Sequence, residues 1–544
     1  MTSTTDRDDP IRHVVLLILE NHSFDQMVGS LAEVYPGLDG VGQSQTRSNL
    51  DPQGRAYGQA PTTERQMLLD PHHELEHVAR QLADHNAGFV QDFAMSFPQS
   101  TAAARQFIMG YYPLGFLPAL HALAREFTIC DRWFSSLPGP TWPNRFFALS
   151  GTSHGRVDMP DDGTHKIDFS GYFEQTQDTI FDRLSARGRH WKIYFHDIPQ
   201  SWALTRQRRP ERAARYFYFD EFFDDARGAE AEFPDFCFVE PDYLGWGQND
   251  DHPPHDVMRA EKLLADVYNA LRANEALWRS TLLVVFYDEH GGFYDHVEPP
   301  ATIPPDGHHK DYRFDQLGVR VPALLVSPWV ERGIEHRQFD HTSLLKYLID
   351  KWDLDELGER ARQANSIGAA LARRTPREDT LVRIELSPEE LRPPDAELEE
   401  AAFGTLSAHQ GALASLAIFV KCEIVEGVPW IFVGAARLIE ASRGLLRLVL
   451  CLLSRGAEKI RVSIAEPDKL ARRDAIAKDD IAHALMRRKR RAVPLLAGKI
   501  RDETLPLAER EHAQHTLALI SKRKFHLRPD NFASAKAWLE RRGY

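Results

Sequence analysis

Short apolar runs separated by longer helical patterns constrain the fold of this chain more than any other feature of its sequence. Runs of this length and composition are typical of strands buried on both faces of a parallel sheet. Helical patterns lie between and after them, such as Val257–Ala273 and Ser343–Leu348. The alternation predicts an α/β fold in which helices cover both faces of a mostly parallel sheet. The expected strands are His13–Leu19, Phe127–Trp133, His190–Phe195, Phe236–Val239, Thr281–Tyr287 and Val319–Ser327.

The chain of 544 residues is longer than one such domain needs, and its character changes near residue 375. Residues 376–400 are rich in Pro and Glu, which is typical of a linker. Residues 401–544 carry 26 Lys and Arg against 15 Asp and Glu, whereas residues 1–400 carry 40 against 64. We therefore expect an α/β domain over residues 1–375, a linker over 376–400, and a basic, mostly helical domain over 401–544.

The distribution of charge narrows the choice of partners. An acidic α/β domain argues against a nucleic-acid groove, and the basic residues of the tail are not interleaved with aromatic side chains. The run Arg487–Arg491 could meet an anionic membrane surface, bind a protein partner, dock on the acidic domain, or form a solvated helix face. We expect no nucleic-acid partner, and the oligomeric state stays open.

Targeting and cysteine patterns favour a reducing compartment. The amino terminus, MTSTTDRDDP, lacks the basic start and long apolar core of a secretory signal. The longest uncharged stretch, Ala401–Val420, is too polar to span a bilayer. We expect a cytoplasmic protein, with peripheral contact to a membrane left open. The cysteines are too few for a disulfide framework and are expected to be buried thiols: Cys130, Cys237, Cys422 and Cys451.

The first chemical motif follows the expected strand His13–Leu19 directly. Glu20 and Asn21 supply a carboxylate and an amide oxygen, which are hard ligands for a divalent cation. The alternative is a helix N-cap, made by Asn21 or Ser23, in front of a helix over Gln26–Leu31. Taken alone, this motif favours the cap.

The second motif, DEHGGFYDH, follows the strand Thr281–Tyr287. Asp288 and Glu289 are adjacent carboxylates at a buried strand end, where they repel each other unless a cation or hydrogen-bond donors offset them. The glycines at 291 and 292 allow close backbone approach or a positive φ. A charged strand end beside a glycine turn is the alternative, but the density of acids and histidines favours a metal site.

The third motif, LPGPTWPNR, places a hydroxyl at the expected start of a helix. Pro140 and Pro143 restrict the backbone on both sides of Thr141, and Pro143 suits the first turn of a helix over Asn144–Leu149. Free N–H groups and the helix dipole at such an end suit an incoming phosphate. The alternative is a rigid turn in which Thr141 caps the helix, and the motif taken alone favours this alternative.

Histidines could transfer protons in such a site. His73 and His252 lie in turn-rich loops, DPHH and NDDHPP, while His196 follows the strand His190–Phe195. The next residue, Asp197, could orient His196. Among 24 histidines, any single one is more commonly structural than catalytic.

Together these segments resemble a known family. Eight strings occur in order over about residues 11–370: HVVLLILENHSFDQMVGSL, DPHHELEHV, MGYY, FTICDRWFSSLPGPTWPNRFFALSGTSHG, TIFDRLSARGRHWKIYF, NDDHPPHDV, DEHGGFYDHV and FDHTSLLKYL. They are similar to the phosphoesterase family that includes bacterial and plant non-specific phospholipases C and the respiratory-burst-inhibiting acid phosphatase. The part of the chain after Ala401 resembles no family that we can name.

The resemblance implies an alkaline-phosphatase-like fold with a metal-assisted hydroxyl nucleophile. At the matching positions, the implied metal ligands are Glu20, Asn21, Asp288, Glu289 and the oxygen of Thr141. Thr141 stands where the family has its Ser or Thr nucleophile. The implied catalytic or substrate-contacting histidines are His73, His252 and, with a weaker local match, His196.

The chemistry of the residues agrees with what the resemblance implies. A threonine hydroxyl is a weak nucleophile near neutral pH, so it needs a metal to favour the alkoxide. Oxygen ligands favour Ca²⁺, Mg²⁺ or Mn²⁺, with Zn²⁺ still open. We predict a metal-dependent phospholipase C acting on phospholipids through a phospho-threonine intermediate, with His252 protonating the leaving alcohol. The alternatives are a phosphomonoesterase and a catalytically silent regulatory protein.

Overall fold

The computed structural model describes the greater part of residues 9–392 and a short stretch beyond them. The described residues are 9–42, 47–160, 172–173, 175–244, 248–308, 312–392, 407, 409–413 and 415–416. Several expectations from the sequence lie outside these ranges and stay predictions: the helical character of the basic domain, the run Arg487–Arg491, and the state of Cys422 and Cys451. Cys130 and Cys237 are buried free thiols, as expected.

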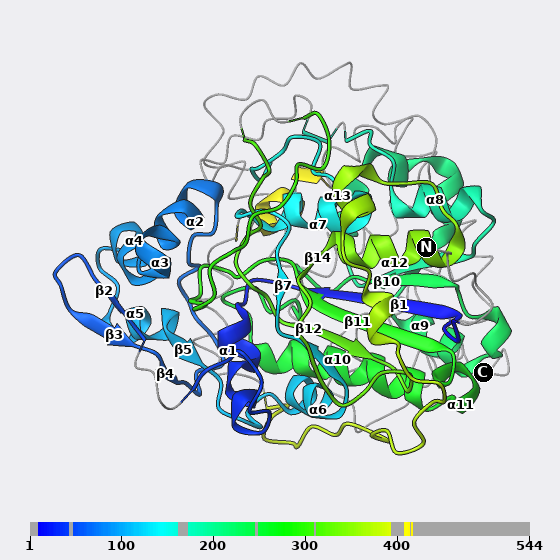
Figure 1. Cartoon of the computed structure of the whole chain (residues 1–544), viewed down its shortest axis with the longest axis horizontal. Helices are drawn as coiled ribbons and strands as arrows, with labels where there is room; N and C mark the ends of the chain where they lie inside the picture. The colour runs from blue at the N-terminus through cyan, green and yellow to red at the C-terminus, as the bar shows by residue number, and fades with distance from the viewer. Residues whose placement is uncertain are drawn as a thin grey trace, which may run out of the picture. The chain divides into compact units, whose positions relative to one another are not determined.

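An eight-stranded mixed sheet lies at the centre of the described structure (Figure 1). Its strand order is β13-β6-β12-β11-β1-β10-β8-β9. The bounds are β1 His13–Leu19, β6 Thr128–Cys130, β8 Trp191–Phe195, β9 Tyr216–Tyr218, β10 Phe236–Val239, β11 Thr281–Tyr287, β12 Ala323–Val326 and β13 Gly333–Glu335. The strands β1, β10 and β11 have the bounds expected from the sequence.

The direction of strand β12 differs from the parallel direction expected for it. β12, the core of the expected strand Val319–Ser327, pairs antiparallel with both β11 and β6, whereas the other neighbouring pairs are parallel. A parallel return requires a crossover connection, usually a helix. The described residues between β11 and β12 form no helix, and the chain re-enters the sheet in the opposite direction. The prediction of a mostly parallel α/β sheet is confirmed, and the direction of this strand is corrected.

Helices cover both faces of the sheet (Figure 1). α10 occupies the range expected for a helix and is capped by Asp256, whose carboxylate accepts a hydrogen bond from the N–H of Met258. One face carries α6 Pro118–Glu126, α9 Asp220–Arg227, α10 Val257–Arg272 and α11 Glu275–Trp278. The other carries α7 Thr141–Ser150, α8 Ile180–Ala186, α12 Thr342–Trp352 and α13 Gly358–Gln363.

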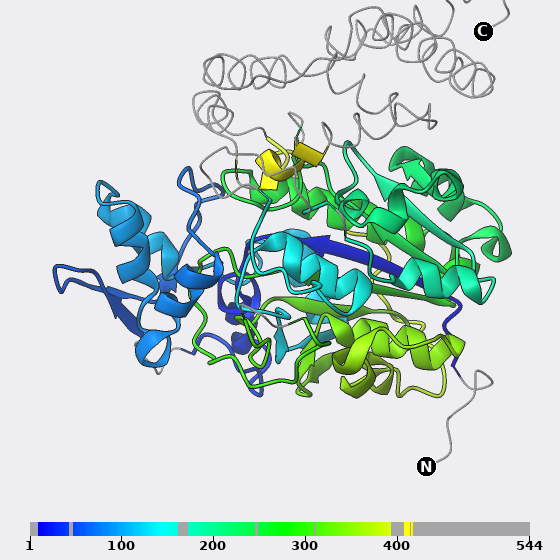
Figure 2. The ribbon, with the colours of Figure 1, turned by 90° about the horizontal axis from the view of Figure 1, so that it is seen from above.

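A lobe of small elements lies beside one end of the sheet (Figure 2, blue). Phe89 and Phe93 form its core with Phe293, which comes from the loop after β11. The lobe is therefore packed directly against the loop that carries the second acidic motif. Its elements are β2 Ser48–Leu50, β3 Ala56–Gly58, β4 Ala60–Pro61, α2 Leu75–Gln81, α3 Ala83–Asn86, α4 Phe89–Ser96, α5 Ala102–Ile108 and β5 Gly110–Tyr111.

The remaining elements are short. Trp133–Phe134 (β7) pairs in parallel with Phe339–Asp340 (β14), and Phe24–Val28 (α1) follows β1. The 3₁₀ turns are Gly29–Glu33, Gln200–Ala203, Thr205–Arg208, Pro210–Arg215, Glu230–Glu232 and Ile367–Ala370. Within the described ranges, none of the helices combines the length and the apolar character that crossing a bilayer requires.

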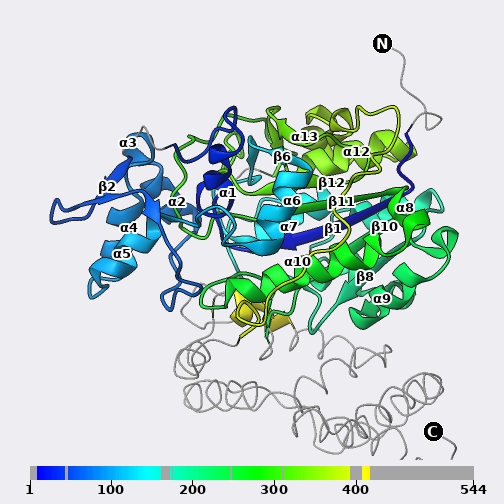
Figure 3. The ribbon, with the colours of Figure 1, turned by 90° about the horizontal axis from the view of Figure 1, so that it is seen from below.

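Residues 376–392, the first part of the expected linker, pack along α10 and α11 (Figure 3). The side chain of Asn269 donates to the carbonyl of Ile384 and accepts from its N–H, both at 2.8 Å. The indole N–H of Trp278 donates to the hydroxyl of Thr380 at 3.2 Å. This part of the chain is therefore tied to the α/β domain by specific hydrogen bonds.

Candidate active site

The sheet brings the acidic motifs together because its central strands end side by side. β1 and β11 pair from His13↔Thr281 to Leu19↔Tyr287, so the residues that follow them emerge at the same edge. The N–H of Asp288 donates to the carbonyl of Leu19 at 3.0 Å, and the N–H of Glu20 donates to the carbonyl of Asp250 at 2.8 Å. Three loops thus meet at the carboxyl ends of parallel strands, where α/β proteins commonly bind ligands.

The two glycines after the second motif permit this close approach. Gly291 and Gly292 have φ values of 62° and 75°. A Cβ on Gly291 would lie 2.1 Å from the carbonyl oxygen of Asn21, and one on Gly292 would lie 2.9 Å from that of His72. Side chains at these positions would separate the loop from both neighbours, so the sequence-based expectation of close backbone contact is confirmed.

Thr141 is the first residue of α7, directly after Pro140. The preceding turn is held by Asn144, whose amide oxygen accepts from the N–H of Leu137 and whose amide nitrogen donates to the carbonyl of Gly139. The hydroxyl of Thr141 is buried and forms no hydrogen bond with the described residues. The alternative of Thr141 as a helix cap is therefore not what the structure shows. At the first motif, the cap of α1 is Ser23, which leaves Asn21 without that role.

Arg145 connects the helix of Thr141 to the acidic strand ends. Its guanidinium lies 2.8 Å from Oε1 of Glu20 and donates to Oδ2 of Asp288 at 2.8 Å and to the hydroxyl of Tyr243 at 2.5 Å. All four residues are fully buried. Arg145 was not predicted as a site residue, although a basic residue one turn after Thr141 in a largely apolar helix was a signal for it.

His73 and His252 face each other across the site. Nε2 of His73 lies 3.4 Å from the side-chain nitrogen of Asn21 and 3.8 Å from Oε1 of Glu289. The rings of His73 and His252 have centroids 6.1 Å apart, and Nε2 of His252 lies 3.7 Å from Oδ2 of Asp70. Two of the predicted histidines therefore lie beside the predicted metal ligands.

The electrostatics of the site reflect buried negative charge. Burial raises the pKa of Glu289 to about 8, and it raises the pKa of Glu20 well above its usual value despite the neighbouring Arg145. Burial alone would lower the pKa of His73, but the carboxylates of Glu289 and Asp70 raise it to about 9. A bound cation would offset such an excess of buried carboxylates.

The donor atoms fit a hard divalent cation. We call Glu20, Asn21, Thr141, Asp288 and Glu289 the strand-end cluster. Oε2 of Glu20, Oδ1 of Asn21, Oγ1 of Thr141 and Oε1 of Glu289 are buried without a hydrogen-bond partner among the described residues, whereas Oε1 of Glu20 is paired with Arg145. The oxygens of Asp288 differ, because they accept from Arg145 and from the N–H of Glu289. An all-oxygen set of this kind suits Ca²⁺, Mg²⁺ or Mn²⁺.

His196 is placed differently from the other two histidines. It follows β8, with Nδ1 2.8 Å from the carbonyl of Glu240 and its ring stacked on Phe219 at 4.4 Å. The expectation that Asp197 orients it is wrong, because the Asp197 carboxylate accepts the N–H of Tyr243 at 3.0 Å. The Asp197 carboxylate therefore accepts a hydrogen bond from the backbone of the loop after β10. No described contact joins His196 to the strand-end cluster.

One further histidine reaches the cluster from beyond the expected linker. Nδ1 of His409 lies 3.4 Å from Oε1 of Glu20, and its ring centroid lies 4.8 Å from that of Tyr243. Burial and the positive charge of Arg145 lower the pKa of His409 well below its usual value. The local sequence gave no signal for this contact, because residues after 400 were expected to form a separate domain.

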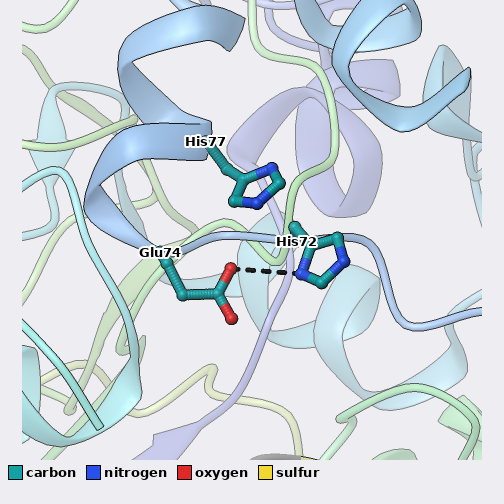
Figure 4. Close-up of side chains that lie close together, drawn as sticks. All are labelled: His72, Glu74 and His77. Atoms are coloured by element: carbon teal, nitrogen blue, oxygen red, sulfur yellow. Dashed lines mark ion pairs between the residues drawn. The ribbon is translucent and has the colours of Figure 1, made fainter. Parts of the chain in front are cut away.

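Other side-chain groups in the described structure also resemble metal sites. Figure 4 shows His72 and Glu74 facing each other, with His77 beside them. Nδ1 of His72 lies 3.3 Å from Oε2 of Glu74. His77 is already engaged, since its Nδ1 lies 3.0 Å from Asp92. The groups whose candidate ligand atoms all lie within 4.8 Å of one another are His72–Glu74–His77, His154–Asp306–His308 and Asp25–Asp295–His296. All three are separate from the strand-end cluster.

Solved structures similar to this chain share little sequence with it. A protein in the alkaline phosphatase superfamily from Vibrio parahaemolyticus aligns over 46% of this chain and 63% of its own, with a TM-score of 0.28 and 12% identity. The lipoteichoic acid synthase LtaP from Listeria monocytogenes aligns over 77% and 94%, with a TM-score of 0.32 and 10% identity. Overlaps of this extent say nothing about the chemistry of the site.

Sequence relatives are considerably closer. Non-specific phospholipase C6 of Arabidopsis thaliana is 37% identical over 364 residues, which is 62% of this chain and 66% of the relative, just under two thirds of its length. Non-specific phospholipase C3 of the same plant is 33% identical over 410 residues, covering 69% of this chain and 76% of the relative. The non-hemolytic phospholipase C of Pseudomonas aeruginosa is 28% identical and covers 64% and 54%.

A family model settles the classification that the eight strings predicted. The model described as the Phosphoesterase family matches residues 11–355, which contain β1, α7, β11 and every member of the strand-end cluster. The chain therefore belongs to the Phosphoesterase family, a family of phosphoric-ester hydrolases.

Proposed function

We propose that this chain is a metal-dependent phospholipase C that cleaves the phosphodiester of phospholipids through a phospho-threonine intermediate. One observation carries the proposal. The strand-end cluster buries several hard oxygen donors without hydrogen-bond partners among the described residues, at the point where β1, β11 and α7 meet. Buried polar atoms usually have partners, so a group of orphaned oxygens at one place is typical of a ligand site. The names of the relatives supply the substrate class.

The strand-end cluster would hold the cation. When bound, a divalent cation there favours the deprotonated hydroxyl of Thr141 and offsets charge on a phosphoryl oxygen. Arg145 holds two carboxylates of the cluster in place, because it contacts both Glu20 and Asp288. This arrangement positions the carboxylates before any substrate arrives and costs no reorganisation during the reaction.

The covalent step is an in-line displacement at phosphorus. The hydroxyl of Thr141 loses its proton to solvent, Oγ1 forms a bond to phosphorus, and the bond from phosphorus to the diacylglycerol oxygen breaks. The departing oxygen takes a proton and leaves as diacylglycerol, while the headgroup phosphate stays on the threonine. Water then attacks phosphorus, releases the phosphorylated headgroup and restores the threonine hydroxyl.

The proton for the departing oxygen comes from one of the two facing imidazoles. We assign it to His252, whose Nε2 is buried without a hydrogen-bond partner among the described residues, while Nδ1 contacts the carbonyl of Pro253. His73 is the competing donor, because nearby carboxylates raise its pKa to about 9, whereas burial lowers that of His252 well below the usual value. Replacing each by Ala distinguishes them: loss of the donor costs phosphatidylcholine hydrolysis far more than hydrolysis of an ester with a nitrophenol leaving group.

Variants of Thr141 test the proposal in the full-length protein. Thr141→Val keeps the shape of the buried side chain without the hydroxyl, and we expect it to lose roughly 10³-fold or more of the activity. Thr141→Ser keeps the hydroxyl and should retain measurable turnover. Thr302→Ala, a partly buried threonine whose N–H bonds to Asp315, is the matched control.

Two substrates separate the proposed activity from its alternatives. Release of diacylglycerol from phosphatidylcholine or phosphatidylethanolamine vesicles, measured beside hydrolysis of p-nitrophenyl phosphate, distinguishes a phosphodiesterase from a phosphomonoesterase. Each assay is run with Ca²⁺, Mg²⁺, Mn²⁺ or Zn²⁺ added. If Thr141→Val retains wild-type rates on both substrates, the nucleophile is misassigned. If neither substrate reacts with any of the metals, the proposed enzyme is wrong.

A further inference from the structure

A short stretch of chain beyond residue 400 contributes to the candidate active site, although it lies outside the family match at 11–355. The stretch, which we call the 407–416 segment, comprises the described residues 407, 409–413 and 415–416, drawn in yellow in Figure 2. Its helical turn begins with a reciprocal pair of hydrogen bonds. The N–H of Gln410 donates to the hydroxyl of Ser407 at 3.1 Å, and the N–H of Ser407 donates to the side-chain oxygen of Gln410 at 3.3 Å.

Polar and apolar contacts together hold the segment in place. The side-chain nitrogen of Gln410 donates to the carbonyl of Tyr243 at 3.0 Å and lies 3.2 Å from Nε2 of His255. His255 belongs to the loop that also carries His252, and its Nδ1 is bound by Asp250 at 2.5 Å. The apolar residues of the segment are fully buried: Ala412, Leu413 and Leu416.

This anchoring places His409 at the strand-end cluster. Its Nδ1 lies 3.4 Å from Oε1 of Glu20, and its ring lies against Tyr243 and, at 6.2 Å, against Trp142, the neighbour of Thr141. The imidazole is 1% exposed, and neither of its nitrogens has a hydrogen-bond partner among the described residues. A side chain that served only to pack would not need two buried ring nitrogens in that state.

We propose that His409 is a substrate-contacting residue, and that its imidazole N–H donates a hydrogen bond to a phosphoryl oxygen bound at the strand-end cluster. The inference rests on the proposed function, because it requires a phosphoryl group beside Glu20 and Thr141. It adds that the site is completed by a residue that the family match does not include. Either a lipid phosphodiester or free inorganic phosphate presents the required oxygen.

If His409 instead blocked the site, replacing it would change activity and ligand binding in the opposite direction. A segment that merely covered the site would have to leave before a substrate entered, and loss of the His409 side chain would then speed turnover and tighten ligand binding. A segment that only packed would leave both unchanged. A contact with the phosphoryl group requires that both become weaker.

The test measures phosphate binding and turnover in the full chain with the activating metal present. Calorimetry with inorganic phosphate reports the Kd, and phosphatidylcholine vesicles report kcat and KM. We expect His409→Ala to raise the phosphate Kd and the lipid KM roughly 10- to 100-fold, as expected for a lost hydrogen bond to a charged group. His409→Asn, which retains an N–H donor, should recover part of the loss. Ser415→Ala is the matched control, because this hydroxyl bonds within the segment to Gly411.

The outcomes separate this inference from the proposed function. If the wild type hydrolyses the lipid but His409→Ala binds phosphate and lipid as the wild type does, only the inference fails. If His409→Ala binds more tightly or reacts faster, the segment is a cover and the inference fails as well. If the wild type neither hydrolyses phosphoesters nor binds phosphate, both the proposed function and the inference are wrong. Melting temperatures of all variants identify any that fail to fold, in which case His409→Asn decides.

Discussion

Two clusters of buried carboxylates in this protein have similar residue types but differ in whether their oxygens have hydrogen-bond partners. The Arg320 cluster consists of Asp25, Asp295, His296 and Arg320, and the candidate ligand atoms of its acids and histidine lie within 4.8 Å of one another. Arg320 donates to Asp25 at 3.0 Å and to Asp295 at 3.1 Å, while His296 lies 2.8 Å from Asp25. Every carboxylate oxygen in the Arg320 cluster has a partner.

The strand-end cluster has a comparable set of acids and a buried arginine of its own. Arg145 nevertheless leaves oxygens of Glu20 and Glu289, and the hydroxyl of Thr141, without hydrogen bonds among the described residues. The comparison shows that the number of carboxylates does not identify a ligand site. A ligand site is identified by carboxylate oxygens that have no hydrogen-bond donor within the protein. A bound cation stabilises such oxygens, whereas carboxylates that already have donors gain nothing from it.

The largest expected difference between the clusters is in activity. Glu289→Gln removes a candidate ligand and should lower hydrolysis of the lipid roughly 10³-fold or more, as losses of residues that act as a unit in catalysis do. The melting temperature should stay unchanged or rise in metal-free buffer, because a buried charge is removed. Steady-state rates and a thermal scan check both. A folded variant with wild-type activity would mean that the strand-end cluster is structural, like the Arg320 cluster.

The next effect is on stability and concerns the Arg320 cluster. Arg320→Met leaves Asp25 and Asp295 buried without their shared partner, and we expect it to lower the free energy of unfolding by about 3–5 kcal/mol. Arg337→Met, at an exposed arginine paired with Glu335, should change it by less than about 1 kcal/mol. Urea unfolding measures both. Equal stability of the two variants would contradict the assignment of a structural role.

Cation binding should distinguish the clusters next. Adding the activating metal at about 100 times its Kd should stabilise the wild type by about 2.7 kcal/mol, seen as a rise in melting temperature. Asn21→Ala should reduce that rise, and EDTA should remove it together with the activity. His296→Gln should leave the rise intact. A shift that depends on His296 but not on Asn21 would place the cation in the wrong cluster.

The last effect is the pH dependence of stability, which solvent screening of the partly exposed His296 makes the smallest. Burial opposes protonation of His296, but its bonds to Asp25 and Asp39 raise its pKa to about 9. A raised histidine pKa contributes stability that is fully present below the unfolded pKa of about 6.5 and is lost as the pH rises through 9. Urea unfolding between pH 6 and 9.5 should therefore show a steeper loss for the wild type than for His296→Gln. Parallel curves would show that His296 is not held protonated.

The sequence predicted which residues of the candidate site lie together wherever this follows from local pattern. Glu20 and Asp288 directly follow apolar strands, so a parallel sheet places both at one edge without any knowledge of the packing. Thr141 lies between prolines that define the start of its helix. These residues could be found because strand ends and helix starts are encoded within a few neighbouring positions.

The remaining features depend on contacts between distant segments. A buried arginine such as Arg145 and a solvated one look the same in a sequence, and only the packing of α7 against β1 and β11 distinguishes them. The direction of β12 depends on a long connection, and the carboxylate of Asp197 is used by the backbone of a loop 46 residues away. His409 was missed for the same reason, since its neighbours in the chain carry no recognisable motif.

The hydrogen bonds made by residues 376–392 have a practical consequence for anyone who shortens this protein. The family match ends at residue 355, but specific hydrogen bonds tie later residues to the α/β domain. A truncation at that boundary would remove Arg377, which bonds to Glu126. It would also remove Thr380, whose hydroxyl accepts a hydrogen bond from the indole of Trp278. Expression trials designed from the family boundary alone should therefore yield aggregated material, whereas clones that end after residue 416 should stay in the supernatant.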